Sequence, residues 1–230
     1  MPVGTGGVIH LNLNCTDLTR SMEFFRDRLG LRTITRTTPT APQDGTAFGL
    51  SAAQWDAWIM GGSEGFGAPV IDLLQWIVPP PIPRAGPATA GFGRLHIGHP
   101  EGRERQIEDP DGTPIEVTTA QAGVTGVTVA CTDMSRSRRF YEEIVDLGEF
   151  VRLVEGRGEA PAAANTVGIW RMALATADID ADVEWLRRAG VPCRSGPVEL
   201  AMGPGLPSVR FMLFSDPDGT TLELIERPPR

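Results

Sequence analysis

The stretch Asp109-Pro110-Asp111-Gly112-Thr113-Pro114-Ile115-Glu116-Val117 combines a tight turn with the start of a β-strand. Asp and Pro favour the beginning of such a turn, and Gly112 supplies the backbone freedom that its end requires. In the strand, Ile115 and Val117 point to one face and Glu116 to the other. The same turn and strand recur as Asp216-Pro217-Asp218-Gly219-Thr220-Thr221-Leu222-Glu223-Leu224. A glutamate at the same offset in both copies indicates an internal duplication.

A strand followed by a capped helix also occurs twice. Residues 8–14 alternate strictly, and their polar face comprises His10, Asn12 and Asn14. Thr16 or Asp17 can cap a helix over 18–29, which a glycine at position 30 would end. The second copy has Cys131-Thr132-Asp133 before a helix over 134–147.

The remaining hydrophobic patterns complete a repeating unit of one strand, one helix and several further strands. They predict strands around 31–37, 46–51, 55–60, 69–77, 92–98, 150–154, 169–176 and 209–214, and a helix over 179–189. A proline-rich run over 79–90 predicts a stiff, extended connector. We expect four copies of this unit of one strand, one helix and several strands. The second copy lacks its helix, and the third has few residues left for its last strands.

Composition narrows the possible functions. The chain has 230 residues, 41% hydrophobic and 22% charged, which is typical of a globular protein with a substantial core. A net charge of -8 argues against a nucleic-acid groove and against binding to an anionic membrane. We find neither a leader peptide nor an apolar run long enough to span a bilayer. Three widely spaced cysteines indicate a reducing, cytoplasmic environment.

These patterns together resemble the vicinal oxygen chelate superfamily, which includes glyoxalases, methylmalonyl-CoA epimerases, extradiol dioxygenases and bleomycin- or fosfomycin-resistance proteins. The resemblance covers nearly the whole chain. It is carried by residues 10–17, 21–31, 70–76, 168–174 and 178–180 and by both Asp-Pro-Asp-Gly strands. It implies an α+β fold of paired βαβββ modules, whose curled mixed sheets form open cups for a ligand. It divides the chain into an N-terminal half, 1–120, with a candidate metal site and a C-terminal half, 121–230, whose ligand positions are degenerate.

The resemblance also implies metal ligands in the first half. In metal-dependent members, the ligands come from the first and last strands of two modules. His10 and Glu116 stand at two of these positions, and Asp72 stands where the family usually has Glu. The remaining position holds Arg94, but His96 lies two residues later and shares its strand face. The expected metal ligands are therefore His10, His96 and Glu116.

A site of this kind suits several divalent metals. Two imidazoles and a carboxylate fit non-haem Fe(II), and the addition of Asp72 would suit Zn, Ni, Co or Mn. Such a metal can hold vicinal oxygens and stabilise an enolate, with Glu116 or Asp72 as the general base. The alternative is that Arg94 forms an ion pair with Glu116 where relatives hold a metal.

The second half holds Gly126, Arg171 and Glu223 at the ligand positions, so no metal is expected there. Arg171 and Glu223 would instead form a salt bridge in a second cup or bind an anionic group. Trp76 shares a strand face with Asp72 and can form the wall of a site for a flat aromatic ligand. The candidate substrate-binding residues are Arg94, Trp76, Asn12, Arg171 and Glu223.

Three functions follow as hypotheses. The favoured one is a metal-dependent lyase, isomerase or epimerase that acts on a small oxygenated molecule through a metal-stabilised enolate. The second is an Fe(II) ring-cleaving dioxygenase. The third is a metal-free protein that binds or sequesters a drug-like ligand, or a metal-free enzyme. Each takes a small molecule as its partner, and each is expected as a monomer or a homodimer.

Overall fold

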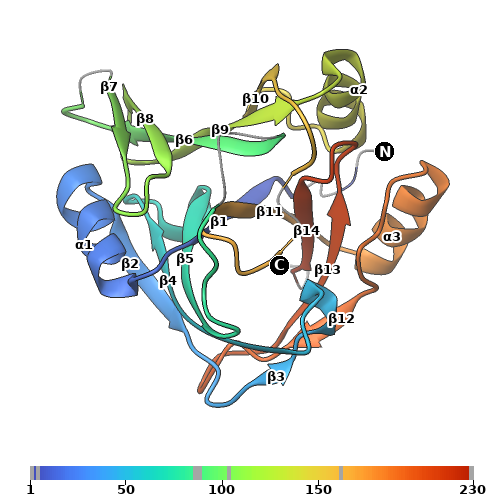
Figure 1. Cartoon of the computed structure of the whole chain (residues 1–230), viewed down its shortest axis with the longest axis horizontal. Coiled ribbons are helices and arrows are strands. Elements are labelled where there is room, and N and C mark those ends of the chain that lie inside the picture. The colour runs from blue at the N-terminus through green and yellow to red at the C-terminus, as the bar shows by residue number, and fades with distance from the viewer. Residues whose placement is uncertain (1–2, 4–5, 85–89, 103–104, 161–162, 228–230) are drawn as a thin grey trace.

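The structure is a computed structural model that describes residues 3, 6–84, 90–102, 105–160 and 163–227. Its strands form two sheets that pack against each other, with the five-stranded sheet above the curled nine-stranded sheet in Figure 1. Among these residues, three α-helices lie on the outside of the sheets (Figure 1). No helix among the described residues has the length and the apolar character needed to span a membrane.

The nine-stranded sheet takes its strands from the beginning and the end of the chain. Its order is β12-β13-β14-β11-β1-β5-β4-β2, with β3 paired to β4. The early strands are β1 (Val8–Asn14), β2 (Arg32–Thr37), β3 (Gln43–Asp44), β4 (Ala52–Gly61) and β5 (Val70–Val78). The late strands are β11 (Gly168–Thr176), β12 (Val198–Leu200), β13 (Val209–Ser215) and β14 (Thr221–Glu226). The antiparallel pairing of β1 with β11 joins the two groups.

The five-stranded sheet comes from the middle of the chain. Its order is β10-β9-β6-β8-β7. The strands are β6 (Gly91–His99), β7 (Arg105–Glu108), β8 (Pro114–Thr119), β9 (Gly123–Cys131) and β10 (Val151–Glu155). Each sheet therefore combines strands from both sides of residue 120. The division into 1–120 and 121–230 follows the sequence repeat and does not separate the two sheets.

The helices begin and end much as the sequence indicates. They are α1 (Leu18–Leu29), α2 (Met134–Arg139), which continues as a π-helical turn over Phe140–Ile144, and α3 (Ile179–Arg188). An aspartate side chain caps each N-terminus, namely Asp17, Asp133 and Asp178. Gly30 ends α1 in the left-handed conformation, with φ of 69°.

Some local predictions differ from the structure. Residues 46–51 do not form a strand, because the Asp44 side chain accepts hydrogen bonds from the backbone N–H and the hydroxyl of Thr46 and begins a 3-10 turn, η1 (Thr46–Phe48). β7 was not predicted, because its sequence Arg-Gln-Ile-Glu has one apolar residue and lies at a sheet edge. Of the predicted connector over 79–90, residues 85–89 lie outside the described residues.

The main core fills the space between the two sheets. Strand alternation places Leu11 and Leu13 of β1 in this core, and it does the same for Leu95 and Ile97 of β6. The polar residues between them must then point to the outer face of each sheet. The polar residues of β1 and those of β6 therefore lie on two different outer faces, one on each sheet.

The two Asp-Pro-Asp-Gly turns hold the sheets together. Asp111, at the turn before β8, accepts hydrogen bonds from the backbone N–H of Thr16 at 2.9 Å and from Arg20 at 2.8 Å, at the start of α1. Asp218, before β14, accepts equivalent bonds from Thr132 and Arg136 at the start of α2, both at 3.0 Å. Each turn thus belongs to one sheet and anchors a helix that follows a strand of the other. The duplicated sequence motif is explained by this duplicated contact.

Candidate functional site

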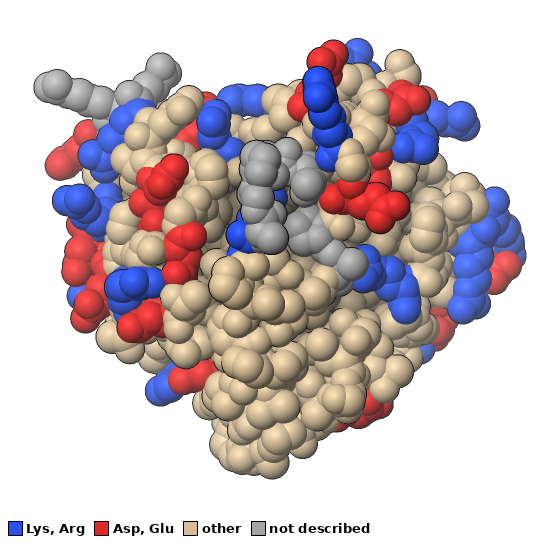
Figure 2. Space-filling view, viewed as in Figure 1, with Lys and Arg blue, Asp and Glu red and all other residues tan. Residues whose placement is uncertain are grey.

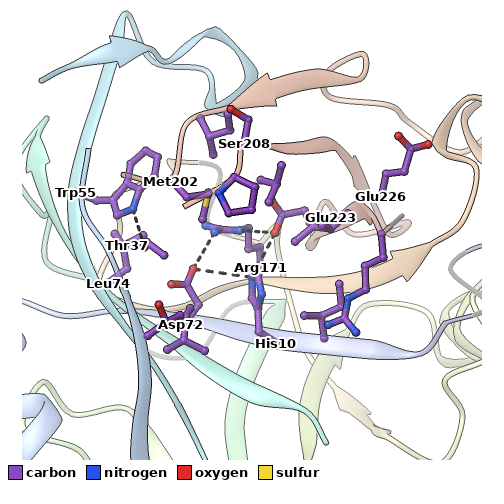
Figure 3. Close-up of a pocket in the computed structure, with 18 of the residues that line it drawn as sticks. His10, Thr37, Trp55, Asp72, Leu74, Arg171, Met202, Ser208, Glu223 and Glu226 are labelled. Carbon is purple, nitrogen blue, oxygen red and sulfur yellow. Dashed lines mark hydrogen bonds and ion pairs between the residues drawn. The ribbon is translucent and has the colours of Figure 1, made fainter. Parts of the chain in front are cut away.

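A mainly apolar cavity lies in the cup of the nine-stranded sheet, on the face that points away from the main core. Its volume is about 370 Å³. The floor is formed by His10 of β1, Asp72 of β5, Arg171 of β11 and Glu223 of β14, which are neighbouring strands of the sheet (Figure 3). All four side chains are nearly buried, with exposed fractions of 7%, 5%, 7% and 3%.

The Arg171 guanidinium lies between the two carboxylates of the floor. Its Nη2 donates to Asp72 Oδ2 and its Nε donates to Glu223 Oε2, both at 2.9 Å (Figure 3). His10 Nε2 lies 3.3 Å from Glu223 Oε2 and 3.9 Å from Asp72 Oδ2, without a well-aligned hydrogen bond. One cationic group therefore bridges two buried anionic groups.

Burial and ion pairing act in opposite directions on the charges of the floor. Burial by itself would lower the pKa of Arg171, but the negative charges of Glu223 and Asp72 outweigh it and raise that pKa. Burial would raise the pKa of Glu223, but Arg171 and His10 outweigh it and lower that pKa. Both groups of the Arg171–Glu223 pair are therefore held in their charged forms at neutral pH.

The walls of the cup are aromatic and aliphatic. Phe48, Trp55 and Trp76 line the cavity together with Leu74 and Met202. The indole N–H of Trp55 donates to Thr37 Oγ1, and that of Trp76 donates to Asn14 Oδ1, each at 3.1 Å. Since these polar atoms already have protein partners, the tryptophans offer apolar surface to the cavity. The outer surface over β3 and β12 also carries few charged residues (Figure 2).

The five-stranded sheet carries a separate polar cluster on its own outer face, where His96 and Arg152 line a pocket. His96 lies there with Glu116, His96 Nδ1 being 3.7 Å from Glu116 Oε1, and His96 Nε2 shares a 2.7 Å hydrogen bond with Thr128 Oγ1. Glu116 accepts a 3.0 Å hydrogen bond from Arg152 and lies 3.6 Å from Arg94. Burial lowers the pKa of His96 more than the nearby Glu116 raises it.

The structure divides the sequence-predicted metal ligands between these two faces. His10 lies with Asp72 in the cup, whereas His96 and Glu116 lie on the outer face of the other sheet. The main core separates the faces, because the apolar residues that alternate with these positions pack between the sheets. The three ligands expected from the resemblance are therefore not brought together.

The other predicted residues fall in both places. Arg171, Glu223 and Trp76 line the cup, and Arg171 and Glu223 form the ion pair that the sequence indicated. Asn12 does not line the cavity; its amide donates to Asp72 Oδ2 at 3.3 Å and supports that carboxylate. Phe48, Trp55 and Met202 were not predicted as site residues. The alternation of apolar residues in β4 could have indicated Trp55. Phe48 and Met202 lie outside the β-strands, where the sequence has no periodic pattern that would indicate their direction.

The cup residues do not fit a resident divalent cation. A metal held by His10, Asp72 and Glu223 would share its carboxylates with a guanidinium that is hydrogen-bonded to two of the three ligands. Arginine stays protonated and repels a cation at this distance. On the other face, Glu116 is bonded to Arg152, and Gly126 has no side chain to contribute. Within the described residues, no three His, Cys, Asp or Glu side chains are grouped to hold a metal.

We expect the stabilising effect of Glu223 to be lost in acid. Its pKa is lower in the folded protein than its ordinary value of 4.5, so it stabilises the fold above that pH and loses this effect as the pH falls through the folded-state pKa. Urea unfolding of the wild type and of Glu223→Gln should show a stability gap at pH 7 that narrows below pH 4.5. A gap that stays constant with pH would contradict this assignment.

Comparison with known proteins supports the fold and leaves the activity open. No family model matches the sequence, and no curated protein matches it either. Glyoxalase I from Zea mays has a similar structure, with a TM-score of 0.66 and 16% identity over 96% of this chain and 92% of that one. A putative dioxygenase from Bacillus subtilis gives 0.62 and 16%, over 97% and 86%. The cppA protein from Streptococcus pneumoniae gives 0.59 and 9%, over 96% and 100%.

These similarities confirm the predicted α+β fold with curled mixed sheets. One fold can host many unrelated reactions, and the sequence identities are low. The function of this chain must therefore be argued from its own cup.

Proposed function

We propose that this protein binds a small, largely apolar organic molecule in the cup of the nine-stranded sheet and does so without a metal. One observation carries the proposal. The guanidinium of Arg171 lies between Asp72 and Glu223, the two carboxylates on the floor of the cup, and occupies the position that a metal ion would need. The chemistry of the floor is that of a fixed ion-pair network.

The shape and lining of the cavity support this proposal. A volume of about 370 Å³ lies in the lower part of the range of small-molecule sites, roughly 300–1,000 Å³. Such sites typically combine apolar walls with a few polar groups that fix the orientation of the ligand. Here the aromatic walls provide the apolar surface, and His10 offers a buried Nε2 without a hydrogen-bond partner.

The metal-dependent hypotheses have less support from this geometry. Enolate chemistry and catechol cleavage both need a cation with open positions beside the substrate. His10 and Asp72 meet Arg171 at the place where such a cation would have to lie. The facial triad proposed for a dioxygenase would need His10 and His96 on one face, and they lie on opposite outer faces of the packed sheets.

Fluorescence titration with N-phenyl-1-naphthylamine, a neutral aromatic probe, tests the proposal in buffer that contains EDTA. We expect saturable binding at one site, and Met202→Trp should weaken it about tenfold or more by filling the cavity, which corresponds to about 1.4 kcal/mol. The matched control Val154→Trp adds the same ring to an exposed strand outside the cup and should leave the affinity unchanged. Absence of binding, or equal binding by Met202→Trp, would contradict the proposal.

One observation favours a second function, metal-free acid–base catalysis. His10 Nε2 faces the cavity and lies 3.3 Å from Glu223 Oε2, so an imidazole and a carboxylate, both side chains used for proton transfer, lie together at the floor. The two functions are separated by incubating the protein with a molecule that it binds and then identifying the recovered molecule by mass spectrometry. An unchanged molecule supports binding alone, whereas a changed molecule that His10→Gln leaves intact supports catalysis.

A further inference from the structure

The charges on the floor of the cup do not balance. Asp72 and Glu223 contribute two carboxylates and Arg171 contributes one guanidinium, so the floor carries one excess negative charge when the His10 imidazole is neutral. All three side chains are more than nine-tenths buried, so water screens the remaining negative charge poorly. At the rim the charges are better matched, because Glu226 is paired with Arg210 at 3.3 Å and Arg227 lies beside the cavity. The excess negative charge is therefore located at the bottom of the cup.

We propose that the cup selects molecules in which a protonated amine is attached to an aromatic or aliphatic body, with the amine beside Asp72 and Glu223. This inference rests on the proposed binding function and specifies its ligand class. An ammonium group would place positive charge next to two carboxylates that share one counter-ion, and it would bring the donors that these oxygens accept. The body of the molecule would then lie against the apolar walls.

The aromatic walls favour the same class of ligand. A cation over the face of an aromatic ring is attracted by the ring quadrupole, most strongly over Trp. The cup already shows this contact, since the Arg171 guanidinium lies 5.9 Å from the ring centroid of Phe48 and 5.6 Å from that of Trp170. Trp55 and Trp76 line the same cavity and have their indole N–H groups bonded elsewhere. Their rings remain to contact a ligand.

A buried polar atom at the floor supplies an independent indication of a ligand. His10 Nε2 lines the cavity, its residue is 93% buried given an exposed fraction of 7%, and it has no hydrogen-bond partner within the described protein. A neutral imidazole can accept a hydrogen bond at this atom from an ammonium N–H. Buried polar atoms normally have partners, so a ligand that donates here would satisfy it.

An anionic ligand is disfavoured by the same contacts. The Nε and Nη2 donors of Arg171 are used by Glu223 and Asp72. A ligand carboxylate would have to displace one of these internal carboxylates and would then lie beside the other. Of the two alternatives that the sequence offers for Arg171, a salt bridge with Glu223 or an anionic ligand, the structure shows the salt bridge.

Calorimetric titration with three probes that share one ring system tests the inference. The probes are 1-naphthylmethylamine, which is cationic at neutral pH, 1-naphthylmethanol, which is neutral, and 1-naphthoate, which is anionic. We expect the amine to bind the wild type about tenfold or more tightly than the alcohol, and the naphthoate to bind more weakly than the alcohol. Asp72→Asn should bring the amine-to-alcohol ratio close to one while the alcohol still binds. Glu184→Gln, the same charge change on the outside of α3, should keep the wild-type ratio.

The outcomes separate this inference from the binding function. Equal affinity for the amine and the alcohol in the wild type would overturn the cation preference and leave binding itself intact. A preference that persists in a folded Asp72→Asn would overturn the assignment to this floor. If Asp72→Asn fails to fold, the wild-type ratio decides. If neither the alcohol nor N-phenyl-1-naphthylamine binds the wild type, the proposed binding function is overturned as well.

Discussion

Replacing Arg171 by Met should lower the free energy of unfolding by about 3–5 kcal/mol, the usual cost of removing one partner from a buried ion pair. The substitution keeps much of the side-chain volume but leaves Asp72 and Glu223 buried without their shared donor. Both carboxylates would have to take up a proton or draw water into the cup. Urea unfolding at pH 7, followed by circular dichroism, measures the loss.

Two further variants show whether charge is the cause. Arg188→Met removes the same side chain from an exposed pair with Glu184 on α3 and should cost less than about 1 kcal/mol. The triple variant Asp72→Asn, Arg171→Met and Glu223→Gln should recover much of the lost stability, because no unpaired charge remains. If Arg171→Met is as stable as Arg188→Met, the buried network does not carry the stability assigned to it here.

Replacing Arg171 by His should give the cup a divalent-cation site that the wild type lacks. The guanidinium is removed, and the introduced imidazole starts from β11, the strand that lies between β1 with His10 and β14 with Glu223. Two imidazoles with carboxylates are suitable ligands for Zn²⁺ or Ni²⁺. Without metal, this variant should melt below the wild type, because two carboxylates lose their partner. Zn²⁺ should then raise its melting temperature by binding the folded state.

Thermal melts with and without Zn²⁺ measure this effect. The wild type should not respond, and the double variant His10→Ala with Arg171→His should lose most of the response. An equal Zn²⁺ response in the wild type would show that the cup binds metal despite Arg171. No response in a folded Arg171→His would show that the floor does not converge as described.

The sequence was sufficient for the fold and for the direction of most site residues. Alternation in β1 and β5 correctly places His10 and Asp72 on the face opposite Leu11 and Leu73. The duplicated Asp-Pro-Asp-Gly turns correctly indicate repeated modules, and each turn makes the same kind of contact at a helix start. These features depend on neighbours in the sequence, so a single sequence reveals them.

The grouping of the site residues could not be read in the same way. Alternation shows which residues of a strand share a face, but it does not show which strand lies beside it. The pairing of β1 with β11 depends on packing across the whole molecule. For this reason His10 was grouped with His96 and Glu116, when its neighbours are Arg171 and Glu223. The residue types at positions 171 and 223 were informative, since Arg and Glu carry opposite charges, and the structure shows the pair that they indicate.

Arg171 at the centre of the cup also separates fold from chemistry. The chain shares its architecture with glyoxalase I at 16% identity, and that likeness establishes the arrangement of strands alone. A single cationic side chain at the centre of the cup changes which ligands the floor can accept. The fixed guanidinium occupies the position between the carboxylates that a metal would need, whereas the ammonium group of the proposed ligand needs only a carboxylate oxygen to accept its hydrogen bond.

The most direct test is the metal content of the wild-type protein. The protein is purified from cells supplied with iron, nickel and zinc, and its metal content is measured by mass spectrometry. Its affinity for N-phenyl-1-naphthylamine is measured on the same preparation. We predict well below one metal ion per chain and the same probe affinity before and after dialysis against EDTA. One bound metal per chain, lost on dialysis together with probe binding and absent from His10→Ala, would contradict the account.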